Sequence, residues 1–234
     1  MNCIRNAWVW CKRIRHRKGY GVHSPFAFNL ITWVIYENLP YYAYGELKEK
    51  RKEYLKNCRC LLPDRAYRTE KVDKLLFRLV NYTQPSTLLD LGTSSGLPLL
   101  YMSFVNSSTR CVTLDVENNT NDFAKELFRE RKNIEFHTGE ITSELVNVLG
   151  SMQSLDFIRL NYLCANDDVF EKCLDKIHSG TMMVVEGIHA TKAMENWWNK
   201  LVDNEYVGIT FDLYSVGIVF FDKTKIKQHY LVNF

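Results

Sequence analysis

The sequence predicts an α/β protein with a doubly wound, mostly parallel sheet that ends in an antiparallel hairpin and follows an N-terminal helical extension. Three observations lead to this prediction. From residue 87 onward, short apolar runs alternate with helical stretches, as in a parallel sheet that helices cover on both sides. A glycine-containing turn follows the first run. The last two runs are joined by too few residues for a helix, so they must pair antiparallel.

The N-terminal part of the chain has the pattern of helices. Ser24 precedes Pro25, a favoured pair of N-cap and first-turn residues, and Pro40 stops the helix that they open. Two further helices are expected, one in a charged stretch and one with an apolar face, at residues 46–56 and 70–82. We therefore assign residues 1–83 to an N-terminal helical extension or lid and residues 84–234 to the sheet domain.

The second part of the chain alternates regularly. Its short buried strands are expected at residues 87–91, 111–115, 134–137, 155–160 and 182–185. Helical stretches separate them, and two of these carry a clear apolar face, at residues 119–131 and 190–202. The final hairpin is expected at residues 206–211 and 215–221. Right-handed crossovers then place helices on both faces of the sheet.

Charge is distributed unevenly along the chain. The net charge is +3, but the first 36 residues carry six Lys or Arg and no acid, so the remainder has a charge of −3. A basic head of this kind suits an anionic substrate, a nucleic-acid backbone or a membrane surface. A solvated basic helix, packed on the domain by its aromatic side chains, is the favoured interpretation.

Composition also limits the cellular setting. With 234 residues and 46% apolar content, the chain can bury a sizeable core. No apolar window is long enough to cross a bilayer, and the first segment lacks the features of a signal peptide, so we expect a cytoplasmic protein. The seven cysteines are odd in number and scattered, which indicates reduced thiols that lie mostly in the core. The oligomeric state is left open.

The turn after the first strand is the candidate ligand cradle. It contains the sequence Asp-Leu-Gly-Thr-Ser-Ser-Gly at residues 90–96, followed by Pro98 in the first turn of the next helix. In open parallel sheets, ligands bind beyond the carboxyl ends of the strands. Gly92 and Gly96 allow a tight turn and a close approach of backbone to ligand. Free N–H groups at the helix start favour an anionic ligand group.

Two acids mark the next strand ends. Asp115 ends the second strand, where a carboxylate can accept hydrogen bonds from both hydroxyls of a ribose. Glu140 follows the third strand, directly after a glycine. The first turn lacks the GxGxxG spacing of a dehydrogenase. Three polar features at the ends of three successive strands therefore indicate one nucleotide-like ligand.

The DxGxxxG form of the turn resembles motif I of the class I S-adenosylmethionine-dependent methyltransferases, and its GTSSG segment is similar to the small-molecule O-methyltransferases. The whole chain resembles a bacterial subgroup of this family through its segments at residues 18–26, 187–189, 217–221 and 227–229. The resemblance implies a Rossmann-like fold and S-adenosylmethionine as the cofactor. It also implies cofactor contacts from Asp90, Gly92, Thr93, Ser94, Gly96, Asp115, Glu140 and Asn161.

The resemblance gives less support to a metal site. Metal-dependent relatives hold a divalent ion with an aspartate that ends the fourth strand and an acid-containing pair after the fifth. The corresponding positions here are Asn161 and Glu186-Gly187. Because hard ions need oxygen ligands and each lost carboxylate weakens the site, we expect no metal. The segment after Asn161 also lacks the two prolines of the amino-methyltransferase signature.

Few residues qualify as acid–base groups. His189 follows the fifth strand, at the carboxyl end of the sheet, and is the first candidate for the base that removes the acceptor's proton. Glu186 is the alternative base, or the group that orients His189. Tyr20 and His23 in the N-terminal segment, and Tyr162 after the fourth strand, are candidates for contacts with the substrate. Packing or capping explains Tyr20 and His23 equally well.

The sequence thus predicts S-adenosylmethionine-dependent methyl transfer to a small-molecule acceptor, preferably at oxygen. Two alternatives stay open. In the first, the chain is a catalytically degenerate protein that binds S-adenosylmethionine or S-adenosylhomocysteine without turnover, as the altered positions Asn161 and Gly187 suggest. In the second, it is a nucleic-acid methyltransferase that uses its basic head. The nucleic-acid alternative is not favoured.

Overall fold

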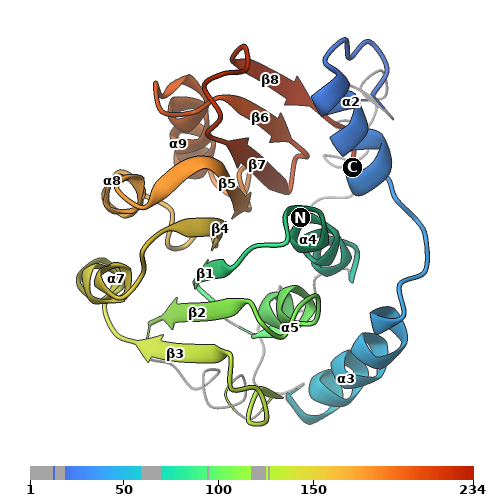
Figure 1. Cartoon of the computed structure of the whole chain (residues 1–234), viewed down its shortest axis with the longest axis vertical. Coiled ribbons are helices and arrows are strands. Elements are labelled where there is room, and N and C mark those ends of the chain that lie inside the picture. The colour runs from blue at the N-terminus through green and yellow to red at the C-terminus, as the bar shows by residue number, and fades with distance from the viewer. Residues whose placement is uncertain (1–12, 14–18, 59–69, 94, 117–124, 126) are drawn as a thin grey trace.

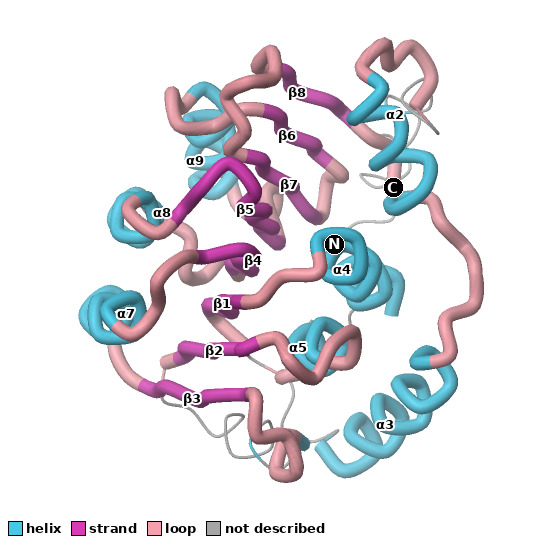
Figure 2. Tube along the Cα trace, in the orientation of Figure 1, coloured by secondary structure: helices cyan, strands magenta, loops and turns pink. Residues whose placement is uncertain are grey.

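The computed structural model describes residues 13, 19–58, 70–93, 95–116, 125 and 127–234. Its centre is one eight-stranded sheet with the strand order β3-β2-β1-β4-β5-β7-β6-β8. Figure 1 shows this sheet nearly edge-on. One face is covered by α7 (Ile141–Gly150), α8 (Asp167–Leu174) and α9 (Lys192–Asp203), and the other by α4 (Glu70–Thr83) and α5 (Leu97–Ser103). The continuous band of strands between two layers of helices is also clear in Figure 2. The predicted α/β class with helices on both sides of the sheet is therefore confirmed.

The first five strands are parallel and lie close to their predicted positions. They are β1 (Thr87–Leu91), β2 (Arg110–Asp115), β3 (Ile134–Thr138), β4 (Leu155–Leu160) and β5 (Ile177–Glu186). The fifth strand begins earlier than its apolar run suggested, because the polar residues at its start are exposed. The strand order changes direction between β1 and β4, so the carboxyl ends of these strands are the expected ligand edge.

The C-terminal strands confirm the predicted antiparallel hairpin. β7 (Val216–Phe220) pairs antiparallel with both β5 and β6 (Ile209–Asp212). A further strand, β8 (Gln228–Leu231), pairs parallel with β6 and was not predicted. Its four residues are mostly exposed and include only one aliphatic side chain, so the strand has no apolar run that would reveal it.

The N-terminal helices differ partly from prediction. Ser24 caps α2 (Pro25–Leu30) through its hydroxyl, with Pro25 in the first turn as expected. The helix then continues as a π-helical turn, η2 (Ile31–Ile35), and ends several residues before Pro40, where the sequence predicted its stop. Arg78 of α4 explains this end, because its guanidinium donates hydrogen bonds to the carbonyls of Val34 and Ile35 at 2.7 and 3.0 Å. These bonds satisfy groups that a longer helix would have used.

The remaining helices are found where helical stretches were expected. They are α3 (Ala43–Cys58), α4 (Glu70–Thr83), α5 (Leu97–Ser103), α7 (Ile141–Gly150), α8 (Asp167–Leu174) and α9 (Lys192–Asp203). The helix predicted at residues 119–131 lies mostly outside the described residues. None of the helices in the described part of the chain is long and apolar enough to cross a membrane.

Two apolar cores cover the two faces of the sheet. One joins the sheet to α2, η2, α3, α4 and α5, and the other joins it to α7, α8 and α9. The N-terminal helices thus share a core with the sheet. Cys111, Cys164 and Cys173 are free and buried in these cores, where burial raises the pKa of each thiol to about 12. They therefore behave as small apolar side chains.

The contact between β7 and α9 depends on a glycine. A Cβ atom at Gly217 would lie 2.9 Å from Cζ2 and 2.5 Å from Cζ3 of Trp198, which is fully buried. We expect Gly217→Ala to lower the free energy of unfolding by about 1–3 kcal/mol through overpacking, as measured by urea denaturation. Gly45→Ala on α3 is the control, because a Cβ there meets no atom within 4 Å. A similar loss in both variants would contradict this account.

Candidate functional site

The loop after β1 has the backbone that its glycines predicted. Gly92 and Gly96 have φ angles of +79° and +73°, in the left-handed region that glycine favours. A Cβ atom at Gly92 would lie 2.8 Å from Cβ of Asn161 and from Sγ of Cys164. Gly92 is therefore required both by the turn and by the close packing of this loop on the segment after β4.

The side chains of the loop point inward. Asp90, Thr93 and Ser95 are 0%, 3% and 6% exposed. The Thr93 hydroxyl donates to Oδ2 of Asp90 at 3.1 Å and also contacts the hydroxyl of Thr113 on β2. Ser94, another predicted cofactor residue, lies outside the described residues. In the described part of the loop, the backbone is therefore the part that a ligand can contact. The buried side chains of Asp90 and Thr93 stabilise the loop through their hydrogen bond.

A buried arginine, which the sequence analysis missed, holds this loop. Nη1 of Arg159 on β4 donates to Oδ1 of Asp90 at 2.7 Å and to the carbonyl of Gly92 at 3.1 Å. Its Nε donates to Oε1 of Glu186 at 2.7 Å. All three charged side chains are at most 1% exposed. One guanidinium thus joins the ends of β1, β4 and β5. It also places Glu186 in a buried ion pair, an arrangement unlike that of a solvent-accessible base.

Asp115 and Glu140 lie at successive strand ends, as predicted. Asp115 ends β2 and is 7% exposed; one of its carboxylate oxygens accepts the N–H of Val116 at 2.8 Å. Glu140 is exposed and caps α7, accepting the N–H groups of Thr142 and Ser143 at 3.0 and 2.6 Å. Hydrogen bonds from Ser143 and Thr142 lower the pKa of Glu140 to about 2. Its carboxylate is therefore already engaged in helix capping.

The positions after β4 and β5 pack against each other. Asn161 is 4% exposed, and its amide oxygen accepts the N–H of Leu163 at 3.1 Å. Tyr162 lies against Gly187, where a Cβ atom would come within 2.8 Å of Cδ1 of the tyrosine. Gly187 has a φ of +73°. Glycine at position 187, in the place of a metal-ligand residue, is thus explained by backbone conformation and by the tyrosine ring.

His189 lies at the carboxyl edge of the sheet and belongs to a cluster of polar and aromatic side chains. Its Nε2 is 2.8 Å from Oδ2 of Asp212, at the end of β6, and its ring stacks on Tyr214 with centroids 5.2 Å apart. Arg13 donates to both carboxylate oxygens of Asp212, at 2.7 and 3.0 Å. Sequence reasoning missed Asp212 and Arg13, since only the fold brings residues 13, 189 and 212 together.

The ionisation of Asp212 follows from these contacts. Burial by itself would raise the pKa of this carboxyl, but the hydrogen bonds from His189 and Arg13 outweigh it and hold the pKa below its ordinary value. An ionised Asp212 only accepts hydrogen bonds, so Nε2 of His189 carries the proton. This assignment leaves Nδ1, which lies 3.8 Å from Oε1 of Glu195, as the nitrogen that can accept a proton.

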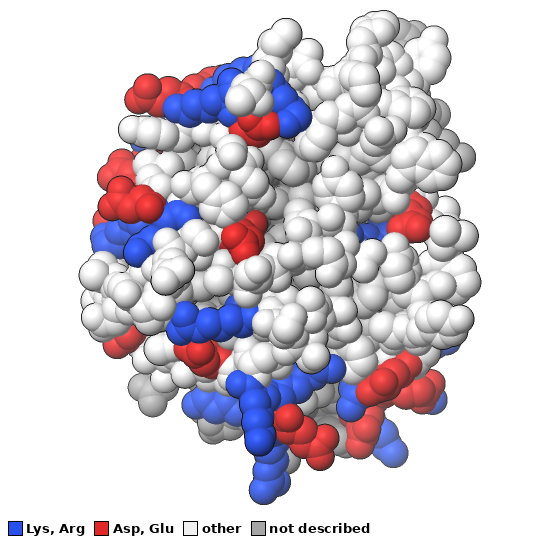
Figure 3. Space-filling view, in the orientation of Figure 1, with Lys and Arg blue, Asp and Glu red and all other residues white. Residues whose placement is uncertain are grey.

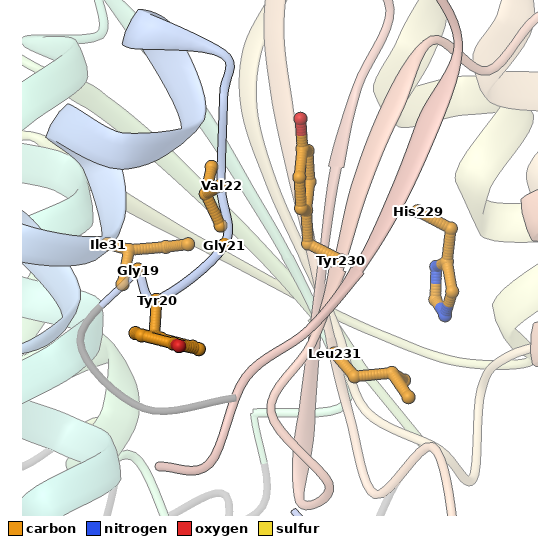
Figure 4. Close-up of a pocket in the computed structure, with 8 residues that line it drawn as sticks. All are labelled: Gly19, Tyr20, Gly21, Val22, Ile31, His229, Tyr230 and Leu231. Carbon is orange, nitrogen blue, oxygen red and sulfur yellow. The ribbon is translucent and has the colours of Figure 1, made fainter. Parts of the chain in front are cut away.

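Tyr20 and His23 are the predicted substrate contacts from the N-terminal segment. Tyr20 lies at a pocket of about 530 Å³ between the turn at residues 19–22 and β8. Figure 4 shows Tyr230 beside this turn, whereas His229 points away from it. Tyr20 is 81% exposed, and His23 is exposed as well. The substrate role of both residues stays a prediction.

The described residues contain no group of three or more His, Cys, Asp or Glu side chains placed to hold a metal ion. The predicted absence of a metal is left untested by this observation. On the face shown in Figure 3, Lys and Arg alternate with Asp and Glu along the lower and left margins, and the surface over α2 is uncharged. Apart from Arg13, the basic residues of the head lie outside the described residues.

The chain is similar to known proteins in its structure. No protein-family model and no curated protein sequence matches the chain. Solved structures do match. A Podospora anserina methyltransferase, PaMTH1, bound to S-adenosylhomocysteine, has 13% sequence identity and a TM-score of 0.62, with 79% of this chain and 98% of that chain covered.

Two O-methyltransferase structures match in the same way. The Bacillus cereus enzyme in complex with S-adenosylhomocysteine has 16% identity and a TM-score of 0.59, covering 80% of this chain and 95% of its own. TomG from Streptomyces achromogenes, involved in tomaymycin synthesis and solved with S-adenosylmethionine, has 16% identity and a TM-score of 0.57, covering 81% and 93%. The chain therefore has the Rossmann-like fold of the class I S-adenosylmethionine-dependent methyltransferases.

Proposed function

We propose that this chain binds S-adenosylmethionine and transfers its methyl group to an oxygen atom of a small molecule. The observation that carries the proposal is the glycine loop after β1, which lies beside Asp115 at the end of the adjacent strand β2. Similar folds in PaMTH1, the Bacillus cereus enzyme and TomG were solved with this cofactor or its product. That agreement supports the same ligand class here.

The residues present fit the cofactor. The left-handed glycines shape a loop whose described side chains are buried, so its backbone is the proposed contact with the cofactor. The N–H groups of Gly96 and Leu97 already donate to Thr93 and Ser95, and Pro98 has none, so we do not assign the start of α5 to the cofactor carboxylate. We propose that Asp115 accepts hydrogen bonds from the ribose hydroxyls and that Glu140 and Asn161, directly after β3 and β4, supply further contacts. The cofactor supplies a methyl group on a positively charged sulfur. The protein has to position the acceptor and remove its proton.

We propose His189, rather than Glu186, as the base that removes the proton of the acceptor. Asp212 holds Nε2 of His189 and keeps Nδ1 as the basic nitrogen, whereas Glu186 is paired with Arg159 in the protein interior. Tyr162, which is half-buried after β4 and packs against Gly187, is proposed as a substrate contact. His189 and Asp212 together form the general base of the proposed reaction.

Calorimetry with S-adenosylmethionine and S-adenosylhomocysteine tests the cofactor. We expect Asp115→Ala to weaken binding by about 100-fold, because two hydrogen bonds to a charged acceptor are lost. Asp175→Ala is the matched control, since Asp175 is exposed and distant in sequence from the loop. Affinity should stay unchanged there. A wild-type chain that binds neither compound would contradict the proposed function.

The alternative of a protein that binds the cofactor without turnover is not favoured by the similar structures, which include O-methyltransferases. It is motivated by Asn161 and Gly187 at two of the expected metal-ligand positions and by the pairing of Glu186 with Arg159. Incubation of the protein and S-adenosylmethionine with a metabolite extract, with and without Mg²⁺, separates the two. Formation of S-adenosylhomocysteine above the rate of the His189→Gln variant supports the enzyme. Tight binding with no such product supports the alternative.

A further inference from the structure

A second pocket, unrelated to the glycine loop, lies where α4 begins and the last residues of the chain follow β8. Its volume is about 300 Å³. It is lined by Ile35, Tyr36, Asn38, Glu70, Lys71, Lys74, Arg78 and Phe234. Figure 1 marks the C-terminus close to α4, and the ammonium of Lys71 lies 4.0 Å from the centre of the Phe234 ring. Three cationic side chains and one acidic side chain, that of Glu70, thus line the pocket.

Glu70, the acidic side chain that lines the pocket, already has two polar partners. Oε1 of Glu70 lies 3.2 Å from Nζ of Lys74 and accepts the hydroxyl of Tyr101 at 2.9 Å. Glu37, which follows η2 and lies outside the lining, accepts the hydroxyl of Tyr41 at 2.5 Å. Lys74 therefore has a partner of opposite charge, and the other two cations do not share it.

Lys71 and Arg78 have no carboxylate within ion-pair distance among the described residues. Arg78 is 7% exposed, and its hydrogen bonds to the carbonyls of Val34 and Ile35 satisfy two N–H groups without neutralising the charge. Burial around its ammonium and the positive charge of Arg78 both lower the pKa of Lys71. Two cations that repel each other across a cavity are stabilised when an anion enters it.

We propose that this pocket binds a small anion, a phosphate or carboxylate group carried on a compact apolar body. Lys71 and Arg78 supply the charge, and the amide of Asn38 supplies a polar contact. Ile35 and the ring of Phe234 provide an apolar wall for the rest of the ligand. The site is separate from the proposed cofactor loop, so the proposal does not depend on methyl transfer.

The test uses the whole chain and three probes: inorganic phosphate, phenyl phosphate and benzoate. We expect saturable binding of phenyl phosphate or benzoate by calorimetry, stronger than that of phosphate alone. Lys71→Gln should weaken this binding by at least about tenfold, the effect of one lost hydrogen bond between charged groups. Lys48→Gln is the matched control, because Lys48 is an exposed lysine on α3 away from the pocket. It should leave affinity unchanged.

The outcomes are distinguishable. Equal losses in Lys71→Gln and Lys48→Gln would indicate a general electrostatic effect and overturn the proposal, as would the absence of saturable binding of all three anions. A folded Lys71→Gln protein is verified by its circular dichroism spectrum and melting temperature. Titration with S-adenosylmethionine is run separately. Because Lys71 is not part of the glycine loop, failure at one site leaves the result at the other unaffected.

Discussion

Replacing Arg159 by methionine is expected to lower the free energy of unfolding by about 3–5 kcal/mol, the effect of breaking a buried ion pair by removing one partner. The guanidinium is 1% exposed and is bonded to Asp90 and to Glu186, both at 2.7 Å. Without it, two carboxylates are left in the protein interior beside the loop they support. Urea denaturation followed by tryptophan fluorescence measures the loss.

Two further variants show whether the charges cause this effect. Arg159→Met combined with Asp90→Asn and Glu186→Gln removes all three charges and should recover much of the lost stability. Arg110→Met breaks a partly exposed pair with Glu135 at 2.8 Å, and should cost less than about 1 kcal/mol. Equal losses of stability for Arg159→Met and Arg110→Met would show that burial does not increase the contribution of the Arg159 ion pairs to stability.

His189→Gln is expected to lower kcat by about 10²- to 10⁴-fold while leaving the affinity for S-adenosylmethionine unchanged, since general-base catalysis contributes effects of that size. Asp212→Asn should act in the same direction, because an amide at this position no longer fixes the proton on Nε2. Single-turnover rates and calorimetry on the same samples separate the two quantities. An unchanged kcat in His189→Gln would remove His189 from the mechanism.

The pH dependence of stability follows from the lowered pKa of Asp212. Since the hydrogen bonds from His189 and Arg13 hold the pKa of Asp212 below its ordinary value, this carboxylate contributes stability at all pH values above that ordinary value. The contribution is lost only as the pH falls through the lower, folded-state pKa. A fall in rate in the mildly acidic range is therefore not caused by protonation of Asp212. The wild-type melting temperature should show no loss from Asp212 over that range.

Much of the sheet was predictable because buried parallel strands are short apolar runs. Residues 87–91 and 155–160 were predicted at the bounds the structure shows. β8 was not, because an edge strand with exposed polar residues has no apolar pattern. The early end of η2 depends on Arg78, more than forty positions away in the sequence. Local propensity carries no information about such a contact.

The candidate site was likewise predictable only in part from the sequence. The glycines of the loop and the acids at the ends of β2 and β3 follow from strand-end position, and the structure places them there. Arg159 was missed because it lies within an apolar run, where a charged residue reads as an exception. Asp212 was missed because its partners His189 and Arg13 are remote in the sequence. Pairings of this kind are visible only once the sheet order is known.

Asp212 also bears on the order in which the fold assembles. Its side chain binds Arg13 and His189, and its carbonyl accepts the N–H of Val232 at 2.8 Å, so it joins segments that are far apart in the sequence. The glycine loop, in contrast, directly follows β1. Because contacts between distant segments carry a larger loop-closure cost, we expect the Asp212 cluster to form later in folding than the glycine loop.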